Sequence, residues 1–268
     1  MTKLNDAVIL VTGAAGGFGR ELTKQLLGKG SRLILTDINL EILKEQVNKI
    51  QAEITTGEVI QSFGANLANR TDCETLYQKV KALNIPLDVL INNAGMGLFG
   101  RVDEVPVEKW EQLMQVNLIA PIRLSSLFVA DMIARQQGHI VNISSMAGWI
   151  PRPGIAHYSS SKFGLRGFSE GLFHEMKPHN VKVTAVYPFY SRTPMLNSAK
   201  YGTLAESSTK IPDRLIVEPE EVMAHTIEAI AHERLHVFPD RVGKNIHFFK
   251  QNFPLLFDWI SNRLGSLA

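Results

Sequence analysis

The chain has 268 residues, of which 45% are apolar and 20% charged, and this balance excludes a disordered, collagenous or coiled-coil protein. Its 28 Lys and Arg residues against 26 Asp and Glu give a formal charge of +2, which argues against a dedicated nucleic-acid binder. The one cysteine, Cys73, cannot form an intrachain disulfide, and we expect it to be a small buried side chain.

The beginning of the chain lacks the long apolar region of an export signal, because its first apolar segment is interrupted at Thr12. We therefore expect a cytoplasmic protein. No stretch reaches the roughly eighteen uninterrupted apolar residues of a membrane span. Residues 242–264 come closest, but charged residues and Pro254 interrupt them.

Short apolar runs alternate along the chain with longer segments whose apolar residues recur every three or four positions. The runs predict strands at 7–11, 32–36, 58–63, 89–92, 139–143, 182–187 and 235–238. The longer segments predict helices at 18–27, 40–54, 71–83, 107–134, 157–176 and 219–232. Because most strands are apolar throughout, both faces of the sheet should be covered. We expect an α/β fold with a doubly wound, mostly parallel, seven-stranded sheet and helices on both faces.

Two later segments depart from this alternation. Residues 189–217 are polar and rich in turn formers, and are too long for a plain connection, so they predict a mobile substrate lid within a domain spanning 1–240. Residues 241–268 form a hydrophobic C-terminal extension. Three interpretations stay open for it: a helix over the substrate cleft, a subunit interface, or a peripheral membrane contact favoured by Lys244, Lys250 and Arg263. We favour packing within the molecule or at an interface.

A glycine-rich turn follows the first strand and opens the first helix. Gly13, Gly17 and Gly19, with Phe18 between the last two, occupy the position where backbone N–H groups can approach a pyrophosphate. The alternative is a tight turn that binds no ligand. The position after a strand and before an apolar helix favours dinucleotide binding.

An acidic residue ends the second strand, 18 residues past the last glycine of the turn. A carboxylate at Asp37 can accept hydrogen bonds from both ribose hydroxyls and would repel a 2′-phosphate, so NAD is favoured over NADP. Gly16 and Ile38 stand where a basic side chain could neutralise that phosphate. The alternative for Asp37 is a solvated acid or an N-cap for the helix beginning near Asn39.

Further motifs follow in order: Asn92-Asn93-Ala94-Gly95, then Asn117, then Ser145, then Tyr158 and Lys162. With the glycine-rich turn, they make residues 7–238 resemble a short-chain dehydrogenase/reductase. The resemblance implies a Rossmann-type fold, a nicotinamide cofactor and an oxidoreductase that acts on alcohols or carbonyl compounds as a homodimer or homotetramer. Pairing would use the helices that contain Asn117 and Tyr158.

The chemistry of the predicted catalytic residues can also be argued from their positions. Tyr158 and Lys162 are four residues apart, so a helix places them on one face about 6 Å apart along its axis. We expect Lys162 to lower the pKa of the Tyr158 phenol, so that tyrosine can exchange a proton with the substrate. Ser145 ends the fifth strand and would bind the substrate oxygen, while its neighbour Ser144 points the opposite way.

Asn117 interrupts an apolar helix pattern, so its amide must find buried partners. The resemblance implies that Asn117 holds a water linked to Lys162, and that Lys162 also holds the nicotinamide ribose; a purely structural amide is the alternative. No histidine has metal-ligand spacing, and we expect no metal. The resemblance assigns cofactor contacts, besides Tyr158 and Lys162, to Gly13, Gly17, Phe18, Gly19, Asp37, Asn66, Leu67, Asn93, Ala94, Gly95, Pro188 and Thr193.

Two positions differ from the family pattern. Asn66 replaces the usual aspartate, and Phe189 follows Pro188 where a glycine is usual, which puts an aromatic side chain near the active site. Apolar residues border the expected substrate end, which favours a hydrophobic secondary alcohol or ketone; packing between lid and core is the alternative. They are Trp149, Ile150, Pro151, Phe189, Tyr190, Met195 and Leu196.

The sequence therefore predicts an NAD(H)-dependent oxidoreductase that interconverts such an alcohol and its ketone. The alternatives are an NADP(H)-dependent carbonyl or ketoacyl reductase and a non-catalytic dinucleotide sensor. All four predicted catalytic positions carry chemically competent residues, which favours the enzyme over the sensor.

Overall fold

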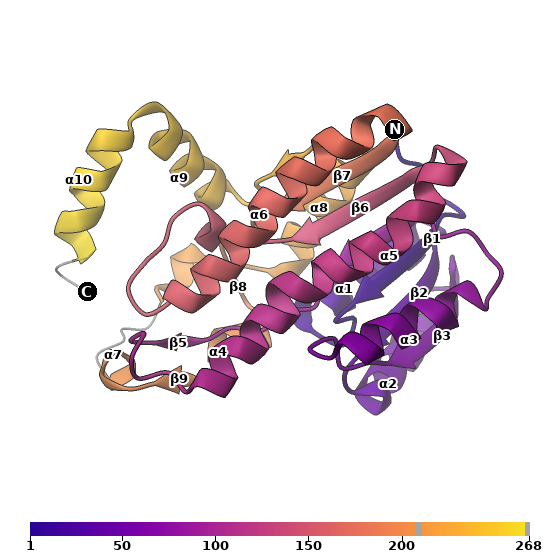
Figure 1. The fold of residues 1–268 in the computed structure, drawn as a ribbon, viewed down its shortest axis with the longest axis horizontal. Helices are drawn as coiled ribbons and strands as arrows, with labels where there is room; N and C mark the ends of the chain where they lie inside the picture. The colour runs from indigo at the N-terminus through magenta and orange to yellow at the C-terminus, as the bar shows by residue number, and fades with distance from the viewer. Residues whose placement is uncertain (207–210, 266–268) are drawn as a thin grey trace.

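The computed structural model describes residues 1–206 and 211–265 and centres on a seven-stranded sheet. All neighbouring strands in this sheet are parallel, in the order β11-β7-β6-β4-β1-β2-β3 (Figure 1). The order reverses at β1, which lies between β2 and β4. Their bounds are β1 Val8–Thr12, β2 Arg32–Asp37, β3 Glu58–Gly64, β4 Val89–Asn92, β6 Gly138–Ile143, β7 Val181–Val186 and β11 His236–Val237.

Helices cover both faces of this sheet. One face packs against α1 (Gly17–Gly28), α2 (Leu40–Glu53) and α8 (Pro219–Ala231). The other packs against α3 (Arg70–Lys81), α5 (Ala120–Arg135) and α6 (Ala156–Met176). The predicted doubly wound, parallel α/β fold is confirmed.

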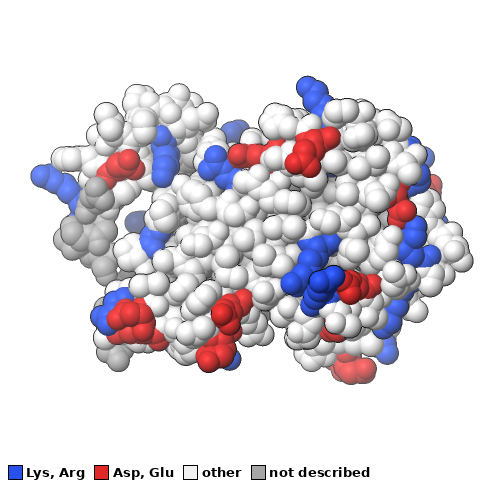
Figure 2. Space-filling model, viewed as in Figure 1, with Lys and Arg blue, Asp and Glu red and all other residues white. Residues whose placement is uncertain are grey.

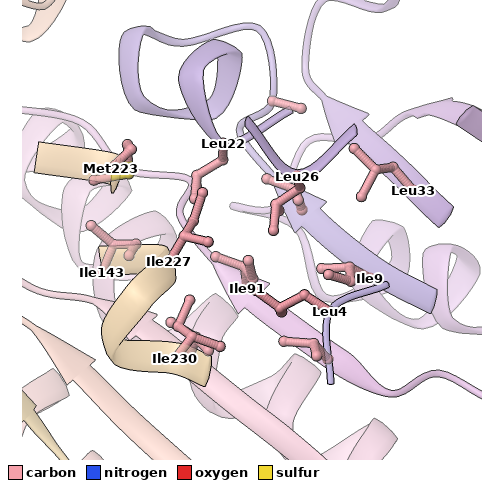
Figure 3. Packing of buried hydrophobic residues seen from close by; sticks show 14 of the residues in the cluster. Leu4, Ile9, Leu22, Leu26, Leu33, Ile91, Ile143, Met223, Ile227 and Ile230 are labelled. Carbon is pink, nitrogen blue, oxygen red and sulfur yellow. The ribbon is translucent and has the colours of Figure 1, made fainter. Parts of the chain in front are cut away.

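Strand residues alternate between two hydrophobic cores, one on each face of the sheet. In β1, Ile9 and Val11 belong to the first core, and Leu10 belongs to the second. Figure 3 shows the first core, where Leu22 and Leu26 of α1 meet Ile227 of α8 over the sheet. Because both faces are buried, the strands carry apolar residues at successive positions, which explains the continuous runs in the sequence.

The predicted helix at 107–134 is present but is not uniformly α-helical. α4 (Val107–Met114) passes into a π-helical turn at Gln115–Ile119 before α5 begins. Pro121 lacks the N–H that would bind the carbonyl of Asn117 in a regular α-helix, and Ala120 N donates to Gln115 O, five residues earlier. Pro121 thus places a helical irregularity at Asn117.

This continuous helix, Val107–Arg135, is the one segment among the described residues that is long and apolar enough to cross a membrane. Length and composition alone are weak grounds for a span, because core helices meet the same criterion. Here Leu124, Phe128 and Met132 are buried in the second core, so the helix forms part of the helical layer over the sheet.

The predicted lid, 189–217, contains short structured pieces in its described part. β8 (Tyr190–Ser191) pairs with β10 (Ile216–Val217), and β9 (Lys200–Tyr201) pairs with β5 (Phe99–Gly100). A four-residue helix, α7 (Thr203–Glu206), follows β9. The lid is therefore attached to the segment after β4 as well as to itself.

The C-terminal extension forms two helices, α9 (Arg241–Asn252) and α10 (Pro254–Gly265), which project from one side of the molecule (Figure 1). We call residues 241–265 the C-terminal arm. The side chains of Phe248, Leu255 and Trp259 are exposed there. The sequence favours packing of this extension within the molecule or at an interface. Intramolecular packing is confirmed for the inner side of α9, where Ile246 and His247 pack on the body of the molecule. It is wrong for the exposed side chains, and the main packing partner of α10 among the described elements is α9.

Candidate active site

The glycine-rich turn is built from close approaches of backbone to backbone. Gly13 has φ +63°, and a Cβ there would lie 2.7 Å from the Cα of Ala94. A Cβ at Gly19 would lie 2.1 Å from the carbonyl oxygen of Gly13. These two glycines are therefore required by the turn itself.

The first turn of α1 is suited to an anion. It carries no acidic residue, and Gly16, at its N-cap, has no side chain to satisfy the first N–H groups of the helix. The turn lies at the carboxyl edge of the sheet where the strand order reverses, the usual ligand crevice of open parallel sheets. The chain thus fits the pyrophosphate of a dinucleotide at this turn.

The loop after β4 is fastened to the turn by Asn93. Its side-chain amide donates to the carbonyls of Thr12 (2.9 Å) and Gly13 (3.0 Å). In return, the Thr12 hydroxyl accepts the backbone N–H groups of Asn93 and Ala94, each at 3.0 Å. The predicted cofactor contacts at 93–95 are thereby held beside the glycine-rich turn.

Asp37 lies against the same turn. Its Oδ2 accepts the backbone N–H of Ala15 at 2.9 Å, and its Oδ1 accepts that of Asn39 at 3.2 Å. The N-cap of α2 is Asn39, whose side chain accepts the N–H of Ile42, so the N-cap alternative for Asp37 does not hold. Asp37 is half-buried at the edge of the predicted ribose site.

Asn66 and Leu67 follow β3 at the same edge of the sheet. The side chain of Asn66 accepts the N–H of Ala68 at 3.2 Å, and its backbone N–H donates to Asp72. Leu67 is buried in the second core. The Asn66 side chain thus shapes its own turn, as asparagine commonly does in loops.

Tyr158 and Ser145 lie close to each other. Tyr158 lies in the first turns of α6, and the Ser145 side chain lies near enough to its hydroxyl to lower the Tyr158 pKa. Ser145 is half-buried after β6, whereas Ser144 is buried and donates to the carbonyl of Lys162 at 3.1 Å. The expected opposite orientation of the two serines is confirmed.

Lys162 is buried one helical turn beyond Tyr158. Its Nζ donates to the carbonyl of Ile143 at 2.9 Å and lies 5.7 Å from the ring centroid of Tyr158. Burial lowers the pKa of Lys162 to about 8. Burial also raises the pKa of Tyr158, and only the hydrogen bond from Ser145 opposes this shift. The prediction that Lys162 lowers the pKa of Tyr158 is therefore wrong when only the groups of the protein itself act on the tyrosine.

Asn117 has partners for both ends of its amide. Its Nδ2 donates to the carbonyl of Met96 (2.9 Å) and to the Ser161 hydroxyl (3.3 Å), and its Oδ1 accepts the N–H of Met96 (2.8 Å). A Cβ added at Gly95 would lie 3.4 Å from that Oδ1 and 3.8 Å from Lys162 Nζ. Asn117 therefore positions the 95–96 loop beside Lys162, which supports a structural role for its side chain. That Asn117 also holds a water linked to Lys162, as the family resemblance implies, stays a prediction.

The loop after β7 reaches both the turn and the C-terminal arm. A Cβ at Gly17 would lie 2.7 Å from Thr193 Cγ2, so Thr193 stands against the start of α1. The buried Pro188 accepts the N–H of Met146 at 2.9 Å. The N–H of Phe189 donates to Asp240 Oδ2 at 2.8 Å. The unusual Phe189 is thus held by a carboxylate from the N-cap of α9.

Apolar side chains border the substrate end in two small clusters. In one, Tyr158 packs with Met96, Trp110 and Tyr201 beside Leu98. We call the other the aromatic wall; its members are Met146, Trp149, Ile150, Ala185, Tyr187, Phe189, Phe238 and Ile246. Next to this wall lies a groove of about 460 Å³, lined by Trp149, Ile150, Pro151, Phe163, Arg166, His247, Lys250 and Gln251.

Three residues at the site were not expected from sequence. Met96 is bound through its backbone by Asn117, Tyr201 shares the cluster of Tyr158, and Asp240 holds Phe189. Tyr201 lies in the two-residue strand β9, which is too short to show a periodic pattern in the sequence. Pro239-Asp240 before an amphipathic segment was a signal for Asp240, since aspartate is a common N-cap.

Comparisons with known proteins agree with this geometry. Residues 7–202 match the family model for short chain dehydrogenase. The chain is 32% identical over 250 residues to nodulation protein G of Rhizobium sp. strain N33, covering 92% of this chain and 97% of that protein. It is 31% identical over 251 residues to mouse epidermal retinol dehydrogenase 2, covering 92% of this chain and 78% of that protein.

Among solved structures, a metagenomic short-chain oxidoreductase in complex with NADP superposes with a TM-score of 0.72. It shares 30% sequence identity, and the match covers 88% of this chain and 97% of that one. The chain belongs to the short-chain dehydrogenase/reductase family. It is an oxidoreductase of the class that acts on CH–OH and carbonyl groups with a nicotinamide dinucleotide.

Proposed function

We propose that the protein is an NAD(H)-dependent oxidoreductase that interconverts a hydrophobic secondary alcohol and its ketone. The observation that carries this proposal is the buried Lys162, one helical turn from Tyr158 on α6 with its Nζ 5.7 Å from the tyrosine ring, next to Ser145. This group lies at the carboxyl edge of the sheet, as does the dinucleotide turn.

A nicotinamide dinucleotide bound at this turn supplies the hydride acceptor for oxidation and the hydride donor for reduction. Ser145 donates to the substrate oxygen and holds it at the Tyr158 hydroxyl. In oxidation, Tyr158 takes the hydroxyl proton as the carbinol hydride leaves, and the positive charge of a bound oxidised cofactor would have to offset the burial that raises the Tyr158 pKa. In reduction, neutral Tyr158 returns a proton to the forming alkoxide. Lys162, fixed by Ile143 O, would hold the nicotinamide ribose and keep a positive charge near the tyrosine.

The preference for NAD rests on Asp37. Its carboxylate is anchored by the N–H of Ala15 within the turn, so it stays at the predicted ribose edge. A 2′-phosphate placed there would meet this negative charge at short range, and charge repulsion in a half-buried site is costly. Ile38, the next residue, is exposed and offers no compensating charge.

The preference for a hydrophobic substrate rests on the two apolar clusters on either side of the serine and tyrosine. Met195 is 40% exposed, and its Cε lies 3.8 Å from where a Cβ at Gly95 would stand. The aromatic wall includes both Trp149 and Phe189. Such a lining favours a substrate that has an apolar body and one polar group held in a fixed orientation. A relative, mouse epidermal retinol dehydrogenase 2, is named for retinol, which is a hydrophobic but primary alcohol, so it supports only the apolar character of the substrate.

We also propose that the protein pairs through α5 and α6. Figure 2 shows a broad surface over these helices with few charged side chains. Gly167 and Gly171 of α6 have open space where a side chain would stand, which permits close approach by another helix. The molar mass in solution by light scattering tests this pairing.

The catalytic proposal is tested by following reduced nicotinamide absorbance with a panel of secondary alcohols and ketones. Tyr158→Phe should abolish turnover and leave NADH binding by fluorescence titration nearly unchanged. Tyr77→Phe, in the contact between α3 and α5, is the matched control and should behave like wild type. Wild type without activity across the panel would favour a dinucleotide sensor instead.

The cofactor preference has a separate test. NADH and NADPH are titrated against the wild-type protein and against Asp37→Ser. Wild type should bind NADH more tightly, and Asp37→Ser should reduce that difference. Equal or tighter NADPH binding by wild type would contradict the role given to Asp37.

A further inference from the structure

The C-terminal arm exposes an unusual share of the apolar surface. Twelve large apolar side chains are exposed among the described residues, and five of them lie in the arm. The remaining seven are scattered between residues 1 and 195. Single exposed apolar residues are ordinary, whereas a concentration of them marks an interaction surface. The five are Phe248, Phe253, Leu255, Leu256 and Trp259.

The arm is apolar on two opposite sides. Phe257 faces α9, where its ring lies 6.1 Å from that of Phe249, and this contact fixes the hairpin. Leu255 and Trp259 are four residues apart and lie on the other side of α10, at 85% and 54% exposure. The inner side is therefore partnered by α9, and the outer side faces away from the molecule.

The charges of the arm indicate what covers the outer side. Residues 241–265 carry four basic residues and one acidic residue, Asp258. Figure 2 shows the arm as mostly uncharged with several separate basic side chains. The guanidinium of Arg263 stacks on Trp259, 4.5 Å from the ring centroid. Tryptophan and arginine side chains both suit the boundary between the hydrocarbon and the headgroups of a bilayer, because each has an apolar body and a polar end.

The arm is also fixed to the substrate end of the active site. Lys250 Nζ donates to the carbonyl of Trp149 at 3.1 Å, and Asp240 accepts the N–H of Phe189. The groove beside the aromatic wall has α9 as one side. Whatever binds the arm is therefore held next to the apolar end of the site.

We propose that the arm docks on an anionic lipid surface, with Leu255 and Trp259 inserted among the acyl chains, and presents the substrate end of the site to the bilayer. The second half of this inference rests on the proposed function: a hydrophobic alcohol or ketone dissolved in lipid would reach the aromatic wall with little exposure to water. A second copy of the chain is the competing occupant of the outer side, and it would not require the basic charge.

The test is flotation of the full-length protein with phosphatidylcholine vesicles, with and without phosphatidylserine. Wild type should float with the serine-containing vesicles and less with phosphatidylcholine alone, and salt should release it. Leu255→Glu with Trp259→Glu should weaken partitioning about a hundredfold or more, because two large apolar side chains no longer insert. Ile42→Glu, at an exposed apolar position on α2, is the matched control and should float like wild type.

Turnover separates this inference from the proposed function. The double variant should match wild type on a water-soluble alcohol and be slower on an alcohol carried in vesicles. Flotation without turnover would support lipid docking and remove the proposed function. Wild type that stays with the soluble fraction, or a double variant that floats equally well, would overturn lipid docking. If wild type is an oligomer that does not float, and the double variant is monomeric, the outer side binds a second copy of the chain instead.

Discussion

Asp240 holds the C-terminal arm to the active-site loop, and its replacement by alanine gives the sharpest energetic prediction. The side chain is 2% exposed, and its two oxygens accept the backbone N–H groups of Phe189 (2.8 Å) and Gly243 (2.6 Å). A hydrogen bond to a charged group contributes about 1.5–3 kcal/mol. Asp240→Ala removes both bonds, so we expect the free energy of unfolding to fall by about 3–5 kcal/mol.

The same variant should affect the site. Without Asp240, the backbone of Phe189 loses its hold on α9, and the aromatic wall loosens. We expect KM for a hydrophobic substrate to rise, while kcat changes little because Tyr158, Ser145 and Lys162 are untouched. Asp240→Asn keeps one acceptor and should give an intermediate loss of stability. Urea unfolding followed by circular dichroism and tryptophan fluorescence measures the stability.

Asp88→Ala is the matched control. Asp88 Oδ2 accepts the N–H of Val8 at 2.9 Å, and its Oδ1 accepts longer bonds from Arg135 (3.4 Å) and Gln137 (3.5 Å), far from the substrate end, at the opposite edge of the sheet. It should lose about 1.5–3 kcal/mol with KM unchanged. A loss below about 1 kcal/mol in Asp240→Ala, or an equal rise of KM in the control, would refute the reasoning.

Three further predictions concern groups whose surroundings are equally well defined. Gly13→Ala forces a side chain into φ +63° and against Ala94, and should cost at least about 1 kcal/mol in urea unfolding as well as weaken NADH binding in a fluorescence titration. The pKa of Lys162 falls to about 8 on folding, so the unfolded chain binds more protons above that pH and stability should rise from pH 8 to 10. Lys162→Met should remove this rise, whereas Lys81→Met, at an exposed ion pair, should keep it in the same urea titrations. Burial lowers the pKa of His139 to about 3, so the unfolded chain takes up a proton first as pH falls below about 6.5, and stability should decrease toward pH 3. His139→Gln should flatten this acid limb, and an unchanged limb would show that other groups cause it.

Much of the fold followed from local patterns, because buried parallel strands and their covering helices leave strong periodic signals. The expected sheet and six helices are present with ends within a few residues. The position of Ser145 also followed, since alternation at a strand end is a local property. In contrast, β5 and β9 have two residues each and pair across about a hundred positions, so nothing local predicts them.

The site electrostatics and the C-terminal arm could not be predicted in the same way. The spacing of Tyr158 and Lys162 places an amine near a phenol, but the sign of the pKa shift depends on how far surrounding atoms exclude water from each group. Likewise, the apolar residues of the arm indicated burial. Whether such residues face the protein depends on whether a surface lies opposite them, and in the described part of the chain the main partner of α10 is α9.

The aromatic wall and the cluster around Leu98 are separate from the two large cores that hold the sheet. Substitutions at distant, independent positions usually have additive effects on stability. Substitutions in these small clusters should therefore leave the packing of the two main cores nearly unchanged. Specificity in this chain can therefore diversify, in nature or by design, while the nucleotide-binding half stays as it is.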